Sequence, residues 1–292
     1  MNFIETAPKG SSKSVKLHYA DLGTGKPVVF IHGWPLNHEM WEHQLSELPF
    51  HNLRCIAYDR RGFGKSDRPW ESYDYDTLAN DLKALLDQLD LNDVTLVGFS
   101  MGGGEIARYI GKYGTNRIAK VVLISAVTPF MLKTENNTEG VDREVFDEMV
   151  KNIGLDRPAF FAEFGKKFYG VGMMSHPVSQ AFLDWNQAHC LMASPKATVD
   201  CVRSFSETDF RNDLKKINVP VLIIHGDADK IVPINISSDI TSELIPQSEY
   251  IVYRGAPHGL FITEKDKLNN DLLAFMGVKQ AHHKSLELQE SY

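Results

Sequence analysis

Short apolar runs alternate with longer amphipathic stretches in the first part of the chain. Four runs are rich in apolar and β-branched side chains at consecutive positions, namely residues 28–31, 54–58, 94–97 and 121–124. Such runs are typical of strands that are buried on both faces. Residues 75–90 carry leucines at helical spacing, and residues 105–113 predict a further helix. This alternation predicts a mostly parallel sheet that is covered by helices.

The pattern changes after residue 127. Up to residue 210 the sequence is rich in aromatic residues and predicts helices without a convincing strand, at residues 141–153, 158–169, 177–191 and 195–205. Strand patterns return at residues 219–224 and 249–253. We therefore predict three parts: a sheet-building core of residues 1–127 and 211–277, a helical cap inserted at residues 128–210, and a polar C-terminal tail at residues 278–292.

Composition is that of an ordinary globular protein. Hydrophobic residues make up 43% and charged residues 24% of the 292 residues, which is a usual balance for an enzyme in water, and this length supports one sizeable core. The net charge is −7. Because phosphate binding requires a concentrated basic surface, this charge argues against nucleic acid as a partner.

The sequence gives no indication of secretion or of a membrane partner. The N-terminal segment becomes polar by Lys9 and lacks the continuous apolar stretch of a signal peptide. No apolar run approaches the ~20 residues that span a bilayer. Cys55, Cys190 and Cys201 have no metal-ligand spacing, so we expect free thiols in a reducing compartment. We predict a cytoplasmic protein, and a homo-oligomer is compatible with its sequence.

The most informative motif is Gly98-Phe99-Ser100-Met101-Gly102, which fits the pattern G-x-S-x-G. It follows a predicted strand and precedes a predicted helix, the context in which this pattern forms a nucleophile elbow. Small residues two positions before and after the serine permit a tight turn that exposes the hydroxyl above the sheet edge. We predict that Ser100 is a catalytic nucleophile.

A serine hydroxyl becomes an effective nucleophile only when a base takes its proton and an acid orients that base. Of the eleven histidines, His258 lies in a loop after the last predicted strand and is the predicted base. His225 ends a strand and is interpreted as a packed, hydrogen-bonded histidine. Most of the others are assigned to the surface, to helices or to the tail: His18, His38, His43, His51, His176, His189, His282 and His283.

Two aspartates are candidates for the acid. Asp227 and Asp229 both follow the strand at residues 219–224. They therefore lie at the carboxyl edge of the sheet, where the active sites of open α/β sheets are found. Asp229 lies farther out and is better placed to reach His258, whereas Asp227 is better placed to cap the turn. This spacing alone gives Asp229 a modest preference.

His32-Gly33-Trp34-Pro35 follows the first buried strand and is a candidate oxyanion loop. Next to a nucleophile elbow, one N–H of such a loop and the N–H of the residue after the serine bind the developing negative oxygen. Pro35 has no N–H to donate, and it restricts the backbone of Trp34. We predict Trp34 and Met101 as the oxyanion donors, with the Trp34 indole also forming a wall of the substrate pocket.

Two motifs that would indicate other chemistry fail. Gly64-Lys65-Ser66 resembles the end of a phosphate-binding loop, but its first glycine would fall at Asp59. His38 and His43 resemble a zinc helix, yet they are five positions apart instead of four, so they diverge from one helical face. The two arginines after Asp59 are interpreted as partners in structural ion pairs. We predict no metal ion and no cofactor.

Five stretches together resemble the cofactor-free bacterial haloperoxidases of the α/β-hydrolase superfamily, which are also called non-haem chloroperoxidases, arylesterases or perhydrolases. The similarity runs in order from about Lys16 to about Gly277. The stretches are His32-Gly33-Trp34-Pro35, Asp59-Arg60-Arg61-Gly62-Phe63-Gly64-Lys65-Ser66, Gly98-Phe99-Ser100-Met101-Gly102-Gly103-Gly104-Glu105, His225-Gly226-Asp227-Ala228-Asp229-Lys230-Ile231-Val232-Pro233 and Gly255-Ala256-Pro257-His258-Gly259-Leu260.

The resemblance implies an α/β-hydrolase fold, with a mostly parallel eight-stranded sheet flanked by helices and a helical cap. It places the acid at Asp229, the base at His258 and the oxyanion donors at Trp34 and Met101. It also implies activity on small carboxylic esters, and perhydrolysis, in which hydrogen peroxide intercepts the acyl group on Ser100 and releases a peracid that oxidises halide. The expected partners are thus a small ester or carboxylic acid and hydrogen peroxide, without haem or vanadium.

Two other interpretations stay open. A related hydrolase with another bond preference, such as a lactonase, an amidase or a carbon–carbon bond hydrolase, would share the triad. A non-catalytic ligand receptor would share only the fold. Haloalkane dehalogenases and epoxide hydrolases are disfavoured, because their elbow carries aspartate where this chain has Ser100.

Overall fold

The computed structural model describes residues 1–6 and 14–278. Its strands form one sheet in the order β1-β2-β4-β3-β5-β6-β7-β8. The pairs β1/β2 and β2/β4 are antiparallel, and the other neighbouring pairs are parallel. The strands are β1 (Asn2–Thr6), β2 (Val15–Leu22), β3 (Lys26–Ile31), β4 (Leu53–Tyr58), β5 (Val94–Phe99), β6 (Ile118–Ile124), β7 (Val221–Gly226) and β8 (Glu249–Tyr253). The predicted fold class, with a mostly parallel eight-stranded sheet, is confirmed.

The apolar runs of the sequence did not predict β1 and β2, and the burial of these strands explains why. In β1 only Ile4 and Thr6 are buried, while Asn2, Phe3 and Glu5 are exposed. An edge strand with one solvent-exposed face alternates apolar and polar positions, so it has no continuous apolar run. The central strands differ, since β5 and β7 are buried at every position.

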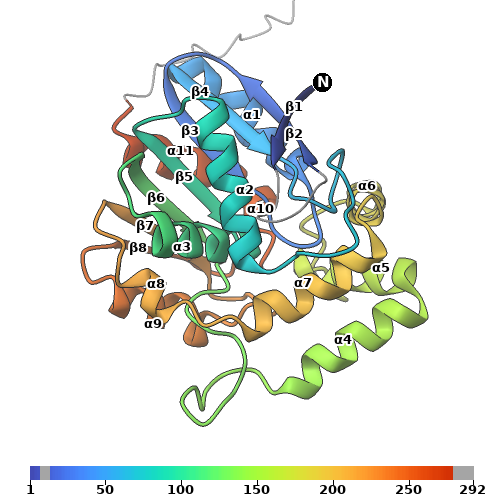
Figure 1. Ribbon diagram of the computed structural model, residues 1–292. Coiled ribbons are helices and arrows are strands. Elements are labelled where there is room, and N and C mark those ends of the chain that lie inside the picture. The colour runs from blue at the N-terminus through green and yellow to red at the C-terminus, as the bar shows by residue number, and fades with distance from the viewer. Residues whose placement is uncertain (7–13, 279–292) are drawn as a thin grey trace, which may run out of the picture.

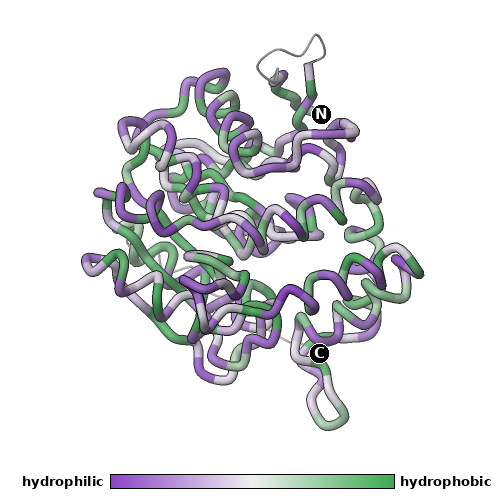
Figure 2. The backbone as a smooth tube through the Cα atoms, turned by 60° about the horizontal axis from the view of Figure 1, so that its bottom comes forward, coloured by the Kyte–Doolittle hydropathy of each residue, from purple (hydrophilic) through white to green (hydrophobic). Residues whose placement is uncertain are grey.

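Helices cover both faces of the sheet, as Figure 1 shows with α2 and α3 in front of the strands and α11 behind them. Figure 2 shows hydrophobic segments along the interior strands, whereas the outer helices alternate between hydrophobic and hydrophilic residues. The core helices are η1 (His38–Trp41), α1 (Glu42–Glu47), η2 (Leu48–His51), α2 (Tyr75–Gln88), α3 (Met101–Tyr113), α8 (Arg211–Leu214), η3 (Ile234–Ile236), α9 (Ser238–Leu244), α10 (Leu260–Thr263) and α11 (Lys265–Met276).

Four further helices lie between β6 and β7: α4 (Arg143–Leu155), α5 (Arg157–Phe168), α6 (Gln180–Leu191) and α7 (Pro195–Glu207). Side-chain caps start three of them, because Asp156, Ser179 and Ser194 each accept a hydrogen bond from the backbone N–H three residues later. Pro195 follows its cap at the first helical position, where a missing N–H costs nothing. We propose that residues 128–210 form a cap over the sheet-building core.

The predicted tail at residues 278–292 lies outside the described residues, apart from Val278. Among the helices that the structure describes, none combines the length and the apolar composition required to cross a membrane.

Two buried ion pairs follow β4, and they confirm that Arg60 and Arg61 are partners in structural ion pairs. The Nε atom of Arg60 lies 2.9 Å from Glu105 Oε2, and Tyr58 also donates a hydrogen bond to Glu105. Arg61 binds Asp81 through two hydrogen bonds of 2.6 Å. These pairs connect the turn after β4 to α3 and to α2.

Candidate active site

Ser100 occupies a strained turn between β5 and α3. Its φ is 54° and its ψ is −116°, a backbone conformation that residues other than glycine rarely adopt. A Cβ atom at Gly98 would lie 2.7 Å from the backbone of Gly102, and one at Gly102 would lie 2.5 Å from the carbonyl oxygen of Ile31. The glycines of the motif are therefore required by close backbone approach, and the serine is held at the carboxyl end of β5.

The structure brings together the three residues that were predicted as a triad. His258 lies in the loop after β8 and is 1% exposed. Its Nε2 atom is 3.1 Å from Ser100 Oγ, and its Nδ1 atom is 2.5 Å from Asp229 Oδ2. Because an ionised carboxylate only accepts, the Nδ1 hydrogen points at Asp229, and the Nε2 lone pair faces the serine hydroxyl. This is the arrangement that lets an imidazole act as a base toward a serine.

The second candidate acid has a different position. Asp227 is exposed, and its carboxylate accepts hydrogen bonds from the Gly255 N–H at 2.6 Å and from Arg254 at 3.1 Å. These contacts join the loop after β7 to the loop after β8. Asp227 thus fixes the spacing of the two loops, and it is Asp229 that contacts His258.

The Asp229 carboxylate is stabilised in its ionised form. Oδ1 accepts the backbone N–H groups of Ile231 and Val232, at 2.8 and 2.9 Å, and Oδ2 faces His258 and His225. Burial alone would raise the pKa of Asp229, but the neighbouring charge of His258 and the hydrogen bonds from both imidazoles outweigh it and hold the pKa well below its usual range.

Among the described residues, the backbone N–H groups of Trp34 and Met101 donate no backbone hydrogen bond. Both residues are buried, and buried N–H groups are costly to leave unpaired. The oxyanion loop packs closely on the elbow: a Cβ atom at Gly33 would lie 2.6 Å from the Phe99 ring and 3.2 Å from Ser100 Cβ. The loop that carries Trp34 is thus packed against the elbow that carries Met101, and their role as oxyanion donors stays a prediction.

The buried side chains of Arg60 and His32 hold the oxyanion loop in place, through contacts that the sequence analysis did not predict. The Arg60 N–H donates to His32 Nε2 at 2.9 Å, and Arg60 Nη2 donates to the His32 carbonyl at 2.8 Å. The remaining ring nitrogen, Nδ1, is 2.8 Å from the Gly33 carbonyl and so carries the hydrogen. Burial, and to a lesser extent the charge of Arg60, lowers the pKa of His32 to about 3.

This neutral histidine makes stability depend on pH. Since the pKa of His32 lies near 3 in the folded chain and near 6.5 without the fold, the unfolded chain binds the extra proton between these values. The free energy of unfolding should therefore fall as pH decreases from about 6.5, by up to about 1.4 kcal/mol per pH unit from this group. Urea unfolding at pH 7, 6 and 5 should give a shallower pH slope for His32→Asn than for the wild type; equal slopes would contradict this origin.

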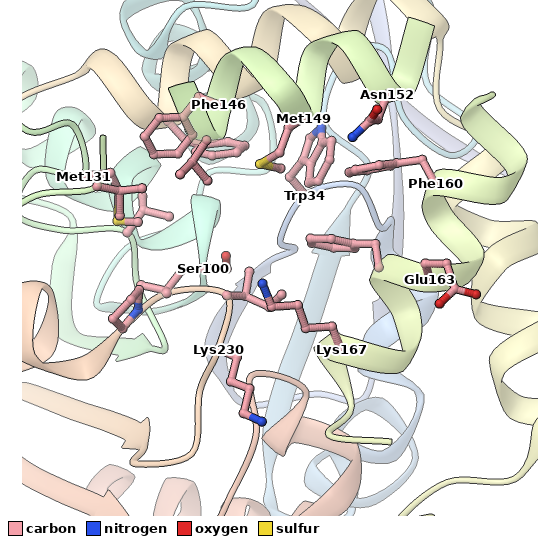
Figure 3. Close-up of a pocket in the computed structure, with 18 of the residues that line it drawn as sticks. Trp34, Ser100, Met131, Phe146, Met149, Asn152, Phe160, Glu163, Lys167 and Lys230 are labelled. Carbon is pink, nitrogen blue, oxygen red and sulfur yellow. The ribbon is translucent and has the colours of Figure 1, made fainter. Parts of the chain in front are cut away.

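A cavity of about 620 Å³ lies above Ser100. Figure 3 shows Ser100 on one side of it, with Trp34, Phe146 and Met149 across from the serine. Its walls are mainly apolar and come from the oxyanion loop, α4, α5 and α7. The indole of Trp34 also contacts the rings of Phe160, Phe164 and Phe205 edge to face, and its Nε1 atom donates to the Thr198 carbonyl of α7 at 3.0 Å.

One buried cluster away from this cavity has the composition of a metal site. Single ligand atoms of His18, His38 and Asp59 lie within 4.8 Å of one another. The Asp59 carboxylate, however, already accepts the backbone N–H groups of His38 and Lys65, each at 2.8 Å, and His38 Nδ1 at 2.7 Å. Hydrogen bonds thus account for its position. The assignment of His18 to the surface or a helix is wrong, since it lies in β2 and is 6% exposed.

The sheet order, the elbow and the helices between β6 and β7 define the class of α/β-hydrolases. The family model described as alpha/beta hydrolase fold matches residues 26–171 and 181–265. The chain belongs to this family, in the branch of the non-haem haloperoxidases, and it is a hydrolase.

Several relatives that are named for an activity are similar in sequence to this chain. The non-heme chloroperoxidase of Kitasatospora aureofaciens is 43% identical and matches 90% of this chain and 96% of its own. The bifunctional esterase/perhydrolase of Acinetobacter calcoaceticus is 41% identical, over 90% of this chain and 96% of that protein. The crystal structure of a bromoperoxidase from Bacillus anthracis has a TM-score of 0.89 and 49% identity, and covers 91% of this chain and 97% of its own.

Proposed function

We propose that this enzyme hydrolyses carboxylic esters through an acyl-enzyme on Ser100, and that hydrogen peroxide can replace water to release a peracid. The observation that carries this proposal is the hydrogen-bonded series Asp229, His258 and Ser100, with distances of 2.5 and 3.1 Å, at an apolar cavity. The names of the relatives, which combine esterase, perhydrolase and chloroperoxidase, support both reactions. They do not favour a lactonase, an amidase or a carbon–carbon bond hydrolase.

In the first half of the cycle, His258 Nε2 takes the Ser100 proton as the oxygen attacks the ester carbonyl. Asp229 holds the imidazole in this tautomer and stabilises its cationic form. The N–H groups of Trp34 and Met101 bind the oxyanion; losing one such donor typically lowers kcat by about 10²–10³-fold. The tetrahedral intermediate then collapses, the C–O bond to the alcohol breaks, and His258 returns its proton to the departing alcohol.

In the second half, His258 takes a proton from water or hydrogen peroxide as that molecule attacks the acyl carbon. The bond to Ser100 Oγ breaks and the serine recovers its proton, so water gives a carboxylic acid and peroxide gives a peracid. The free peracid transfers its terminal oxygen to bromide, which yields carboxylate and hypobromous acid. The halide is therefore oxidised in solution, and the protein supplies only acyl transfer.

The test compares two assays on the same enzyme preparation. Ester hydrolysis is followed with an acetate ester, and perhydrolysis with peroxide-driven bromination of a dye in acetate buffer. We expect bromination to require both acetate and peroxide, to survive a metal chelator, and to disappear with hydrolysis in Ser100→Ala. Bromination that persists without any carboxylate, or that depends on added metal, would overturn the peracid mechanism.

The cavity also predicts how the rate of hydrolysis depends on the size of the alcohol part of the ester. Burial of a phenyl-sized apolar group contributes about 1.5–3 kcal/mol, so kcat/KM should rise roughly 10- to 100-fold from ethyl acetate to 2-phenylethyl acetate. Both esters release an alkyl alcohol, which keeps the leaving-group chemistry similar. Met149 lines the cavity from α4, and Met149→Trp should reduce this preference while ethyl acetate is turned over as before. Equal rates for the two esters in the wild type would show that the cavity does not hold the alcohol part.

A further inference from the structure

A second imidazole contacts the same carboxylate oxygen of the candidate acid as His258 does. His225 is the fifth residue of β7 and has no exposed surface. Its Nε2 atom is 3.1 Å from Asp229 Oδ2 and 2.9 Å from the Val232 carbonyl oxygen. Its Nδ1 atom is 2.7 Å from the hydroxyl of Ser238, a buried residue that begins α9. The sequence analysis anticipated a packed, hydrogen-bonded ring but not the contact with Asp229.

These partners determine where the ring carries its hydrogen. A carbonyl oxygen and an ionised carboxylate can only accept, so the Nε2 atom that faces both must be a donor. The Ser238 hydroxyl can donate or accept, so Nδ1 is satisfied whether or not it bears a hydrogen. The hydrogen on Nε2 is therefore shared between Val232 and Asp229 Oδ2, in either protonation state of the ring.

We propose that His225 is a positioning residue, which holds Asp229 Oδ2 between two imidazole N–H donors and limits the negative charge that this oxygen presents to His258. The inference rests on the proposed roles of Asp229 and His258. Four N–H groups surround the carboxylate, two from the backbone on Oδ1 and two from imidazoles on Oδ2. This arrangement leaves the carboxylate little freedom to rotate. Because His225 also donates to Oδ2, the negative charge of this oxygen is shared between His225 and His258.

The arrangement predicts the direction in which catalysis changes when the donor is lost. Without the His225 hydrogen bond, more negative charge resides on Oδ2, and the cationic form of His258 is better stabilised. The base is then protonated up to a higher pH. Because free enzyme with a neutral base is the reactive form, the acid limb of kcat/KM for ester hydrolysis should move upward.

The first experiment uses the wild-type protein. Uniform ¹⁵N labelling and two-dimensional NMR of the histidine rings report which nitrogen of each ring bears hydrogen, with His225 assigned by its absence from His225→Gln. We expect a hydrogen on His225 Nε2. An Nε2 atom without hydrogen could not donate to Asp229, and that result would overturn the inference without reference to any variant's stability.

The second experiment compares the pH profiles of three variants. His225→Leu removes the donor, His225→Gln keeps an amide N–H at a similar reach, and Ser238→Ala removes only the partner of Nδ1. We expect the acid limb to rise by about half a pH unit to one unit in His225→Leu, and to stay near the wild-type position in the other two. A merely structural role would lower the thermal stability of His225→Leu and Ser238→Ala and leave both limbs unchanged, which would overturn the inference.

The results separate this inference from the proposed function. Unchanged limbs in His225→Leu, together with ester hydrolysis that still requires Ser100, would remove the role of His225 and leave the triad proposal intact. Ester hydrolysis that survives Ser100→Ala would instead remove the roles of Asp229 and His258 on which the inference is built.

Discussion

Replacement of Ser100 by alanine is expected to lower kcat for ester hydrolysis by about 10⁶-fold, the scale found when the nucleophile of a serine triad is removed. The variant keeps a Cβ atom, so the strained turn at φ 54° is as accessible to alanine as to serine. The only side-chain hydrogen bond of the hydroxyl in the described chain is that with His258. The loss should therefore fall on the chemistry, with the fold retained.

Ser125 offers a matched control. It also follows a central strand, with a positive φ of 44°, and is fully buried, and its hydroxyl has no hydrogen-bond partner within the described residues. Ser125→Ala should keep ester hydrolysis and should still react with a fluorophosphonate probe. Ser100→Ala should lose both the hydrolysis and the reaction with the probe, while its melting temperature stays that of the wild type. Substantial hydrolysis by Ser100→Ala would exclude this residue as the nucleophile.

Asp229→Asn is expected to lower kcat by about 10⁴-fold, as loss of the triad acid does in serine proteases. The amide oxygen of asparagine can still accept the N–H groups of Ile231 and Val232. The amide NH₂ then faces His258 Nδ1, which must accept, so the ring hydrogen moves to Nε2 and the lone pair no longer faces Ser100. The geometry is kept while the tautomer is wrong for a base.

Asp227→Asn is the control for this change. Its carboxylate contacts Gly255 and Arg254 and not a member of the triad, so kcat should stay within a fewfold of the wild type while stability decreases slightly. Steady-state kinetics of both variants on one ester decides between the aspartates. A greater loss in Asp227→Asn than in Asp229→Asn would reverse the assignment of the acid.

The sequence predicts the parts of the site that depend on short-range constraints. The elbow needs glycines at positions 98 and 102, because a Cβ atom there would lie 2.7 Å from the backbone of Gly102 and 2.5 Å from the Ile31 carbonyl oxygen, respectively. Both glycines lie within two residues of the serine, so the motif is visible in one stretch of chain. Likewise, β5 and β7 are apolar at nearly every position because both of their faces are covered.

The parts that depend on loop conformation are harder to predict. Whether Asp227 or Asp229 reaches His258 depends on the path of the loop after β7, and spacing gave only a modest preference. The contact of His225 with Asp229, four positions further on, depends on the same loop path, and the contact of Arg60 with His32 joins two loops that are far apart in the sequence. Helical spacing shows that Phe160 and Phe164 share a face of α5, but only the packed structure shows that this face borders the cavity.

The hydrogen bond from the Trp34 indole to Thr198 has a mechanical consequence. The ring of Trp34 lines the cavity, its indole nitrogen donates to α7, and its backbone N–H is one of the two oxyanion donors that we propose. A shift of α7, caused by a mutation, by temperature or by a large substrate, would move the Trp34 side chain. It would thereby displace the proposed oxyanion donor. Substitutions far from the reacting atoms along α7 should therefore alter turnover as well as selectivity.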